Sequence, residues 1–306
     1  MTGTTISIGK VRRLQQCADD EGRAVMLAAD QRGNLRRSLD PVDPAGVRAE
    51  ALVDFKVGLT RALGRYATAV LLDPEYGAAQ AIASGALAGS TGLIVALEAT
   101  GYVGSPTDRR SRILSGWSAK RAARLGASAA KLLVHYHPDA AGAAEQERLI
   151  AESAAACSAQ ELPLIVEPLS FSLDAAPLDA AERRRVVVET ARRVTAIDGV
   201  DVLKAEFPGA EDERQAWEDA CVELTEASHS PWVLLSAGVD FDTFSKRATA
   251  ACSAGASGVL AGRAVWNEAV LMSGVDRIRF YETVGRQRLE RLTDIVRTHA
   301  RPGLRG

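Results

Sequence analysis

The chain has 306 residues, of which 47% are hydrophobic and 25% charged, a composition typical of a globular protein with a substantial core. Its net charge of −2 gives no footprint for nucleic acid or an anionic membrane, so we expect neither as a partner. Four cysteines without metal-ligand spacing, and an N-terminus without an apolar signal segment, predict a cytoplasmic protein.

One uncharged stretch, residues 77–97, approaches the ~20 residues of a membrane span. It is rich in Gly, Ser and Ala and contains Gln80. This composition favours a helix of small residues followed by a buried strand.

Short apolar runs alternate with segments of helical period along the chain. The runs cover residues 24–30, 68–73, 92–98, 129–135, 163–168, 201–206, 232–236 and 257–262. The helical segments include 44–63, 117–125, 144–159 and 180–197, with a last helix over 276–292.

A strand followed by a helix, repeated eight times, predicts parallel strands and right-handed crossovers in a (β/α)8 barrel. We expect one domain over 1–306, with a lead-in at 1–22 and a C-terminal helix and tail at 276–306. A doubly wound sheet is the alternative, but no GxGxxG turn follows the first run and no linker divides the chain.

Lysine is rare in this chain, because 31 of its 37 basic residues are arginine. Lys131 and Lys204 nevertheless lie inside apolar runs, and Glu167 lies in the run between them. Burying an unpaired ammonium costs several kcal/mol, and two close ammonium groups disfavour each other's charge. A lysine held partly neutral is a nucleophile that forms Schiff bases, and a carboxylate between two lysines can move a proton.

The blander interpretation is a lysine at a strand end that reaches solvent or pairs with Glu206. The alternation of residues 201–206 places Val202, Lys204 and Glu206 on one face of the expected strand, with Leu203 and Ala205 on the other.

Polar side chains gather where the expected strands end, which is where barrel enzymes carry their catalytic groups. These are Asp30, Asp73, Glu98, Lys131, His135, Glu167, Lys204, Glu206, Ser236 and Arg263. Asp30, followed by Gln31 and Arg32, could equally cap a helix or form a loop salt bridge.

Small residues after the seventh and eighth runs predict a phosphate site. Ser236 and Gly238 follow one run, Gly262 and Arg263 the other. Tight glycine turns let backbone N–H groups approach an anion, and Arg263 adds a charged fork.

His135 and His137 could begin a zinc site if both lie on one strand face. No further His or Cys falls at a strand end to complete the site, so we expect no metal.

Eight motifs in order resemble the class I tagatose-1,6-bisphosphate aldolase family, which includes the sulfofructosephosphate aldolases. They are MLAADQRG, LLDPEYG, TGY, WSAKRAARLGASAAKLLVHY, LIVEP, DVLKAEFP, LLSAGV and SGVLAGRAVW, and they extend from Met26 to Trp266.

The resemblance implies an aldolase on a (β/α)8 barrel without metal or cofactor. It implies Lys204 as the Schiff-base lysine, with Lys131, Glu167 and Asp30 handling protons around it. Ser236, Gly238, Gly262 and Arg263 match the family's phosphate-binding residues, and we expect Gln31, Arg32 and His135 to contact substrate. Residues 135–138 depart from the family pattern, which leaves the identity of the sugar open.

The expected reaction cleaves a ketose 1-phosphate or 1,6-bisphosphate to dihydroxyacetone phosphate and an aldehyde. Residues 71–77 and 100–102 favour tagatose 1,6-bisphosphate. The alternative, 6-deoxy-6-sulfofructose 1-phosphate, is suggested by residues 230–233 (SPWV) and 255–258 (GASG). A reading of another class is a sugar-phosphate-binding regulator without turnover, and we expect a homo-oligomer in either case.

Overall fold

The computed structural model describes residues 6–174, 176–209 and 214–305. Its strands are β1 (Ala24–Ala29), β2 (Ala69–Leu72), β3 (Gly92–Ala96), β4 (Ala129–His135), β5 (Leu164–Leu169), β6 (Val202–Ala205), β7 (Trp232–Leu235) and β8 (Gly258–Ala261). All pair in parallel in chain order, and β8 closes onto β1. The (β/α)8 barrel predicted from the alternating runs is therefore confirmed.

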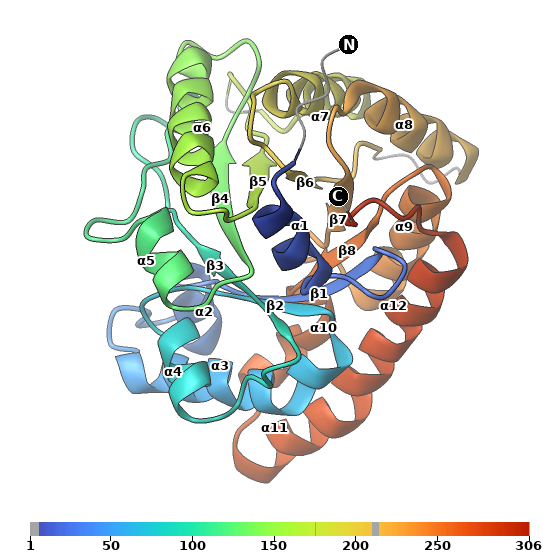
Figure 1. The fold of residues 1–306 in the computed structure, drawn as a ribbon. Helices are drawn as coiled ribbons and strands as arrows, with labels where there is room; N and C mark the ends of the chain where they lie inside the picture. The colour runs from blue at the N-terminus through green and yellow to red at the C-terminus, as the bar shows by residue number, and fades with distance from the viewer. Residues whose placement is uncertain (1–5, 175, 210–213, 306) are drawn as a thin grey trace.

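Most of the helices lie around the outside of the barrel, whereas the first crosses one of its ends (Figure 1). They are α1 (Ile8–Gln15), α2 (Gly33–Leu39), α3 (Ala49–Leu63), α4 (Ala78–Ala83), α5 (Ala119–Arg124), α6 (Ala143–Ser158), α7 (Ala180–Thr195), α8 (Arg214–Ala227), α9 (Phe241–Ser253), α10 (Arg263–Trp266), α11 (Gly274–Phe280) and α12 (Arg286–His299). Side-chain caps begin several of them: Ser118 accepts from the Arg121 N–H, and Asp179 accepts from the Glu182 N–H.

The helical tail extends further than the sequence pattern predicts. A π-helical turn, Tyr281–Gly285, joins α11 to α12, and the helix continues to His299. The uncharged stretch 77–97 divides into α4 and β3, as expected. No helix in the described part of the chain is long and apolar enough to span a membrane.

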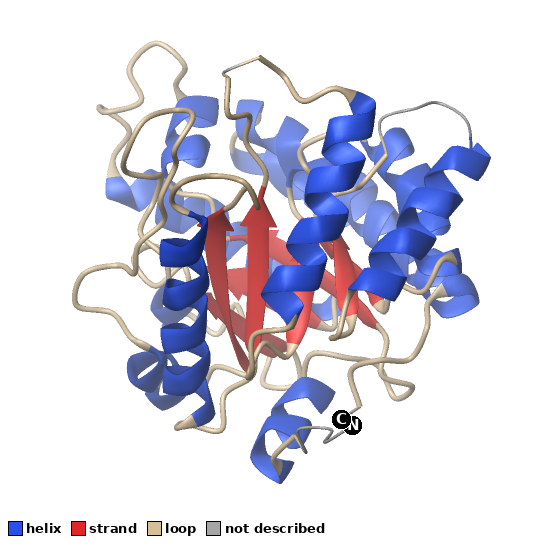
Figure 2. Ribbon diagram, turned by 90° about the horizontal axis from the view of Figure 1, so that it is seen from above, coloured by secondary structure: helices blue, strands red, loops and turns tan. Residues whose placement is uncertain are grey.

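Alternating side chains separate an inner core from an outer one. Met26 and Ala28 of β1 lie in the cluster inside the barrel, whereas Val25 and Leu27 pack against the surrounding helices. Helix α1 covers the N-terminal end of the barrel (Figure 2), where Lys10 Nζ lies 2.8 Å from Asp201 Oδ2. The opposite end, where the strands terminate, is left for the polar residues.

Candidate active site

The alternation of side chains along the strands places the central charged residues inside the barrel. Ala129, Ile165 and Val202 belong to the inner core. Two residues further along the same strands lie Lys131, Glu167 and Lys204, which therefore face inward one layer closer to the C-terminal mouth. Lys131 is fully buried and Lys204 is 4% exposed.

Glu167 bridges the two lysines. Its Oε1 lies 2.7 Å from Lys204 Nζ and its Oε2 lies 2.8 Å from Lys131 Nζ. Lys131 also donates to Asp30 Oδ2 at 2.8 Å and to Glu98 Oε1 at 2.7 Å. The structure thus brings together Asp30, Lys131, Glu167 and Lys204, contributed by four different strands or strand ends.

The charge on Lys131 differs from the sequence-based expectation. Burial opposes the ammonium, but the carboxylates of Asp30, Glu167 and Glu98 outweigh it and raise the Lys131 pKa well above its usual range. Burial likewise disfavours the charged form of Asp30, yet Lys131 and Lys204 hold the pKa of Asp30 below its usual range. The expectation that two ammonium groups lower each other's pKa was wrong for Lys131. The attraction of its three carboxylate neighbours outweighs the repulsion from Lys204.

Lys204 has a much thinner shell of counter-charge. Within the described residues its only ion-pair partner is Glu167. An amine at this position can pass a proton to the Glu167 carboxylate while Lys131 stays charged. The two lysines therefore differ in their number of carboxylate partners: Lys131 contacts Asp30, Glu98 and Glu167, whereas Lys204 shares only Glu167 with it among the described residues.

Glu98 is a residue that the sequence argument noted at a strand end but did not place in the site. Its Oε1 accepts from Lys131 and its Oε2 accepts from the Leu133 N–H at 3.0 Å. The backbone carbonyl of Glu98 accepts from Arg32 Nη2 at 2.6 Å. The sequence did contain a signal for this role, because Glu98 ends the run that precedes the run with Lys131.

Arg32 does not lie free at the mouth as expected of a substrate contact. It is 5% exposed, and its Nη1 donates to Glu75 Oε2 at 2.8 Å. Asp73 is likewise used internally, because it pairs with Lys56 and accepts from the Tyr76 N–H at 2.8 Å. Arg32 therefore supports Glu98 through its carbonyl, and its contact with substrate stays a prediction.

Gln31 keeps an unused polar atom near the end of β8. A Cβ built on Gly262 would lie 3.2 Å from Gln31 Nε2, so the two residues are neighbours. Gln31 Oε1 is buried and has no hydrogen-bond partner among the described residues. A buried amide oxygen without a partner is a candidate ligand contact.

The ends of β7 and β8 meet in a turn that exposes a guanidinium. The Gly262 N–H donates to Ser236 Oγ at 3.3 Å, which ties the two strand ends together. Gly238 has a φ of +80°, and a Cβ there would lie 2.8 Å from Arg263 Cζ. The positive φ favours glycine at 238, and a side chain there would displace the Arg263 guanidinium from its place across this turn.

Comparison with known proteins agrees with this geometry. The sequence profile of the DeoC/LacD family aldolases matches residues 24–268. This chain belongs to the DeoC/LacD family of aldolases. The family resemblance predicted from the motifs is thereby confirmed.

Two curated relatives match nearly the whole of this DeoC/LacD aldolase. Tagatose 1,6-diphosphate aldolase 1 of Enterococcus faecalis is 35% identical, covering 96% of this chain and 97% of the relative. Tagatose 1,6-diphosphate aldolase 2 of Streptococcus agalactiae is 32% identical, covering 95% and 96%.

Solved structures share the fold at lower identity. The fructose-bisphosphate aldolase of Plasmodium falciparum superposes with a TM-score of 0.73 at 16% identity, covering 96% of each chain. A Schiff-base-forming fructose-1,6-bisphosphate aldolase superposes with a TM-score of 0.59 at 18% identity, covering 91% of this chain and 99% of the other. These likenesses concern the barrel alone.

The two histidines at the end of β4 and beyond it make different contacts in this DeoC/LacD aldolase. His135 ends β4, where its Nδ1 lies 3.2 Å from Ser111 Oγ. His137 lies beyond the strand, and its Nδ1 accepts from the Asp139 N–H at 3.2 Å.

A possible metal-ligand group in the described chain is His137, Asp139 and Glu182. Arg185 already pairs with both carboxylates of this group. Its Nη2 lies 2.6 Å from Asp139 Oδ2 and 2.8 Å from Glu182 Oε1. β4 ends at His135, so the condition that both histidines lie on one strand face is not met.

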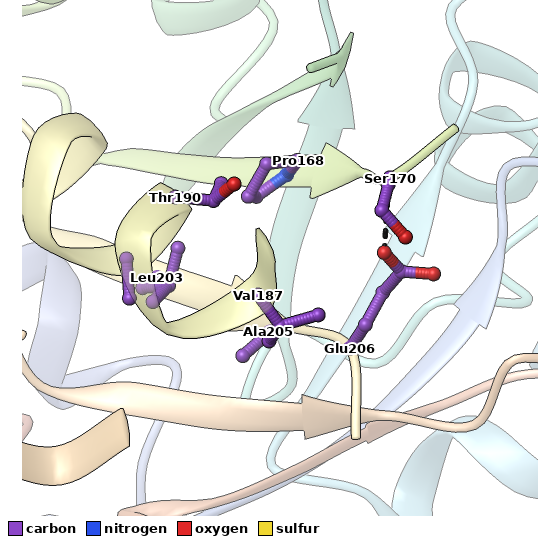
Figure 3. Close-up of a pocket in the computed structure, with 8 residues that line it drawn as sticks. Pro168, Ser170, Val187, Thr190, Leu203, Ala205 and Glu206 are labelled. Atoms are coloured by element: carbon purple, nitrogen blue, oxygen red, sulfur yellow. Dashed lines mark hydrogen bonds between the residues drawn. The ribbon is translucent and has the colours of Figure 1, made fainter. Parts of the chain in front are cut away.

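Glu206 also departs from its expected face. β6 ends at Ala205, so the alternation does not continue, and Glu206 lines a small hollow with Leu203 and Ala205 on the α7 side (Figure 3). Its Oε2 accepts from the Ser170 N–H at 2.7 Å. Burial raises the Glu206 pKa despite this bond. Glu206 therefore joins the loop after β5 to β6, and Lys204 pairs with Glu167 instead.

His135 provides a pH prediction. Burial, followed by the charge of Arg109, lowers the pKa of His135 to about 4, whereas an unfolded histidine titrates near ~6.5. Between these values the unfolded chain binds a proton that the folded chain does not, so the free energy of unfolding should decrease as pH falls through this window. We expect His135→Asn to lose less stability than the native chain between pH 6.5 and 4, measured by urea unfolding. Parallel curves for the two proteins would contradict this.

Proposed function

We propose that this aldolase is a class I enzyme that cleaves a ketose 1,6-bisphosphate, with tagatose 1,6-bisphosphate as the expected substrate, to dihydroxyacetone phosphate and an aldehyde. The observation that carries the proposal is the buried Lys204 in direct contact with Glu167, which also contacts Lys131, a lysine whose pKa is raised by its carboxylate neighbours. The names of the curated relatives support the choice of sugar.

In the proposed mechanism Lys204 passes its proton to Glu167 and its amine attacks the C2 carbonyl of the substrate. Loss of water from the carbinolamine gives an iminium, which accepts the electron pair when the C3–C4 bond breaks. The C4 hydroxyl loses its proton as the aldehyde forms, and the ionised Asp30 is the proposed acceptor. The resulting enamine is protonated at C3 and hydrolysed, which releases dihydroxyacetone phosphate and restores Lys204.

Lys131 has a supporting role in this scheme rather than the proton-shuttling role suggested by the resemblance. Its raised pKa keeps it charged through the cycle. The charge orients Asp30 and Glu167 and compensates for the negative charge that those groups carry. Glu98 accepts from Lys131, and Arg32 donates to the Glu98 carbonyl.

We place the 1-phosphate of the substrate at Ser236, Gly238, Gly262 and Arg263, with Gln31 beside it. Arg263→Ala should remove a charge-assisted contact worth about 1.5–3 kcal/mol, which raises KM for the phosphorylated ketose. Gly238→Ala should have a similar effect, because its Cβ would occupy the space of the guanidinium. The measurement is steady-state kinetics with Arg263→Lys as the variant that keeps the charge. An unchanged KM in Arg263→Ala would place the phosphate elsewhere.

The motifs that suggested the sulfofructose alternative lie far from this site. Residues 230–233 and 255–258 lead into β7 and β8. They lie at the N-terminal ends of these strands, whereas the site lies at the C-terminal ends. The Ser230 hydroxyl, for example, donates to the Val200 carbonyl at 2.8 Å. They therefore bear on packing, whereas residues 71–77 and 100–102 follow β2 and β3 at the mouth.

One assay tests the proposed function. The protein is incubated with tagatose 1,6-bisphosphate, fructose 1,6-bisphosphate or 6-deoxy-6-sulfofructose 1-phosphate, with excess EDTA, and dihydroxyacetone phosphate is measured. We expect fastest release from tagatose bisphosphate. Preference for the sulfonate would select the alternative sugar. Binding without release would favour a regulator, and activity restored only by zinc would overturn the Schiff-base mechanism.

We also propose that the protein works in the cytoplasm as a homo-oligomer. All four cysteines are free and buried, which suits a reducing compartment.

Leu271, Val275 and Ile278 are 85%, 70% and 53% exposed along one segment, which supports a contact between copies. Light scattering after size-exclusion chromatography tests the oligomer, and a monomeric mass would contradict it.

A further inference from the structure

The loop between β3 and α5 folds back over the mouth of the barrel as a short hairpin. Antiparallel bridges join Val103 to Arg110 and Glu98 to Ile113. The hairpin carries Arg109, whose Cζ lies 4.9 Å from the centre of the Tyr102 ring and 5.7 Å from that of Phe171. Phe171 belongs to the loop after β5, so Arg109 spans the space above β4.

Arg109 is a cation without a counter-charge in the part of the chain described here. Its Nε donates to the Pro106 carbonyl at 2.9 Å, and neither terminal nitrogen has a hydrogen-bond partner among the described residues. The next residue provides the contrast, since Arg110 lies 2.6 Å from Asp108 and 2.9 Å from Glu145. A guanidinium held on aromatic faces, with its terminal nitrogens unused, is suited to bind a planar or tetrahedral anion.

The position of Arg109 relates it to the catalytic lysines. The Tyr102 ring packs edge-on against His135 at 5.1 Å, and His135 is four residues after Lys131 on β4. Four residues of strand span about 13 Å, part of which the lysine side chain fills. A sugar whose C2 lies at Lys204 would therefore extend towards this ring system as it leaves the barrel.

Two arginines without carboxylate partners in the described chain thus lie on different sides of the mouth. Arg263 follows β8, and Arg109 lies between the loops after β3 and β5. A substrate with an anionic group at each end matches two separated cations better than one with a single anion does.

We propose that Arg109, with Tyr102 and His135 beside it, binds the second anionic group of the substrate, a phosphate or sulfonate on the sugar carbon farthest from the phosphate at Arg263. This assignment rests on the proposed function of the barrel. His135 is a neutral ring there and contributes a polar contact, while Arg109 contributes the charge. The departure of residues 135–138 from the family pattern falls at this subsite and would tune which anion it prefers.

The test compares Arg109→Gln with Arg110→Gln. Both variants lose one positive charge from the same hairpin, but Arg110 is already paired. Values of kcat/KM are measured for a ketose 1,6-bisphosphate, the corresponding 6-sulfo 1-phosphate and a ketose 1-phosphate without a second anion. We expect Arg109→Gln to lose roughly 10- to 100-fold on one or both doubly anionic substrates and less than about 2-fold on the monophosphate. Arg110→Gln should change none of the three by that much.

Phosphate and sulfonate are distinguished by comparing the loss of kcat/KM in Arg109→Gln for the two doubly anionic substrates. The substrate with the larger loss carries the native distal group. Equal losses on all three substrates would show that Arg109 only holds the hairpin, and no loss on any would place the second anion elsewhere. Borohydride trapping of dihydroxyacetone phosphate, which has one anion, should proceed normally in Arg109→Gln. Trapping without any shift in substrate preference overturns the Arg109 subsite alone, whereas a native protein that neither traps nor cleaves overturns both proposals.

Discussion

Replacing Lys204 with arginine should abolish turnover, lowering kcat by on the order of 10⁴-fold or more, because the covalent route is lost. Arginine keeps the positive charge next to Glu167 but cannot form an iminium. The fold and phosphate binding should survive, since the charge pair with Glu167 can persist and the residues at β7 and β8 are untouched.

Covalent trapping assigns the nucleophile directly. Borohydride reduction with dihydroxyacetone phosphate should attach the three-carbon adduct to Lys204 in the native chain and to no residue in Lys204→Arg. Lys246→Arg, at an exposed position on α9, is the matched control and should behave as the native protein. An adduct on Lys131, with Lys204→Arg still active, would move the nucleophile from β6 to β4.

Lys131→Met should both inactivate the enzyme and destabilise it by about 3–5 kcal/mol, because it removes the charge that three carboxylates share. Asp30, Glu98 and Glu167 would be left buried without their common partner. Their pKa values would rise, so stability of the variant should be greater at low pH and decrease as pH rises through the raised values.

The native chain should show the opposite slope from Asp30. The pKa of Asp30 is lowered in the folded chain, so its contribution to stability is present above the usual aspartate range and is lost as pH falls through the folded value. Urea unfolding at pH 5 and pH 8 would compare the native chain, Lys131→Met and the double variant Lys131→Met with Glu98→Gln. The double variant should regain stability without regaining activity. An unchanged unfolding midpoint in Lys131→Met would show that the carboxylates are compensated by something other than this ammonium.

The sequence by itself determined the barrel and much of what faces into it. Eight apolar runs of strand length, each followed by a helical period, permit few other topologies. Because side chains alternate along a strand, Lys131 and Lys204 had to face inward once Ala129 and Val202 did, and the scarcity of lysine made both conspicuous.

The tertiary structure alone decided how those lysines are charged, because the pKa of a buried group depends on neighbours from other strands. Glu98 and Asp30 follow the ends of β3 and β1, and their approach raises the pKa of Lys131, which inspection of β4 could not show. The end of β6 at Ala205 turned Glu206 away from Lys204, since alternation holds only while the strand continues. Within the described residues Arg109 has no carboxylate partner, and this too depends on the tertiary structure, because the hairpin directs Arg110 towards Asp108 and Glu145.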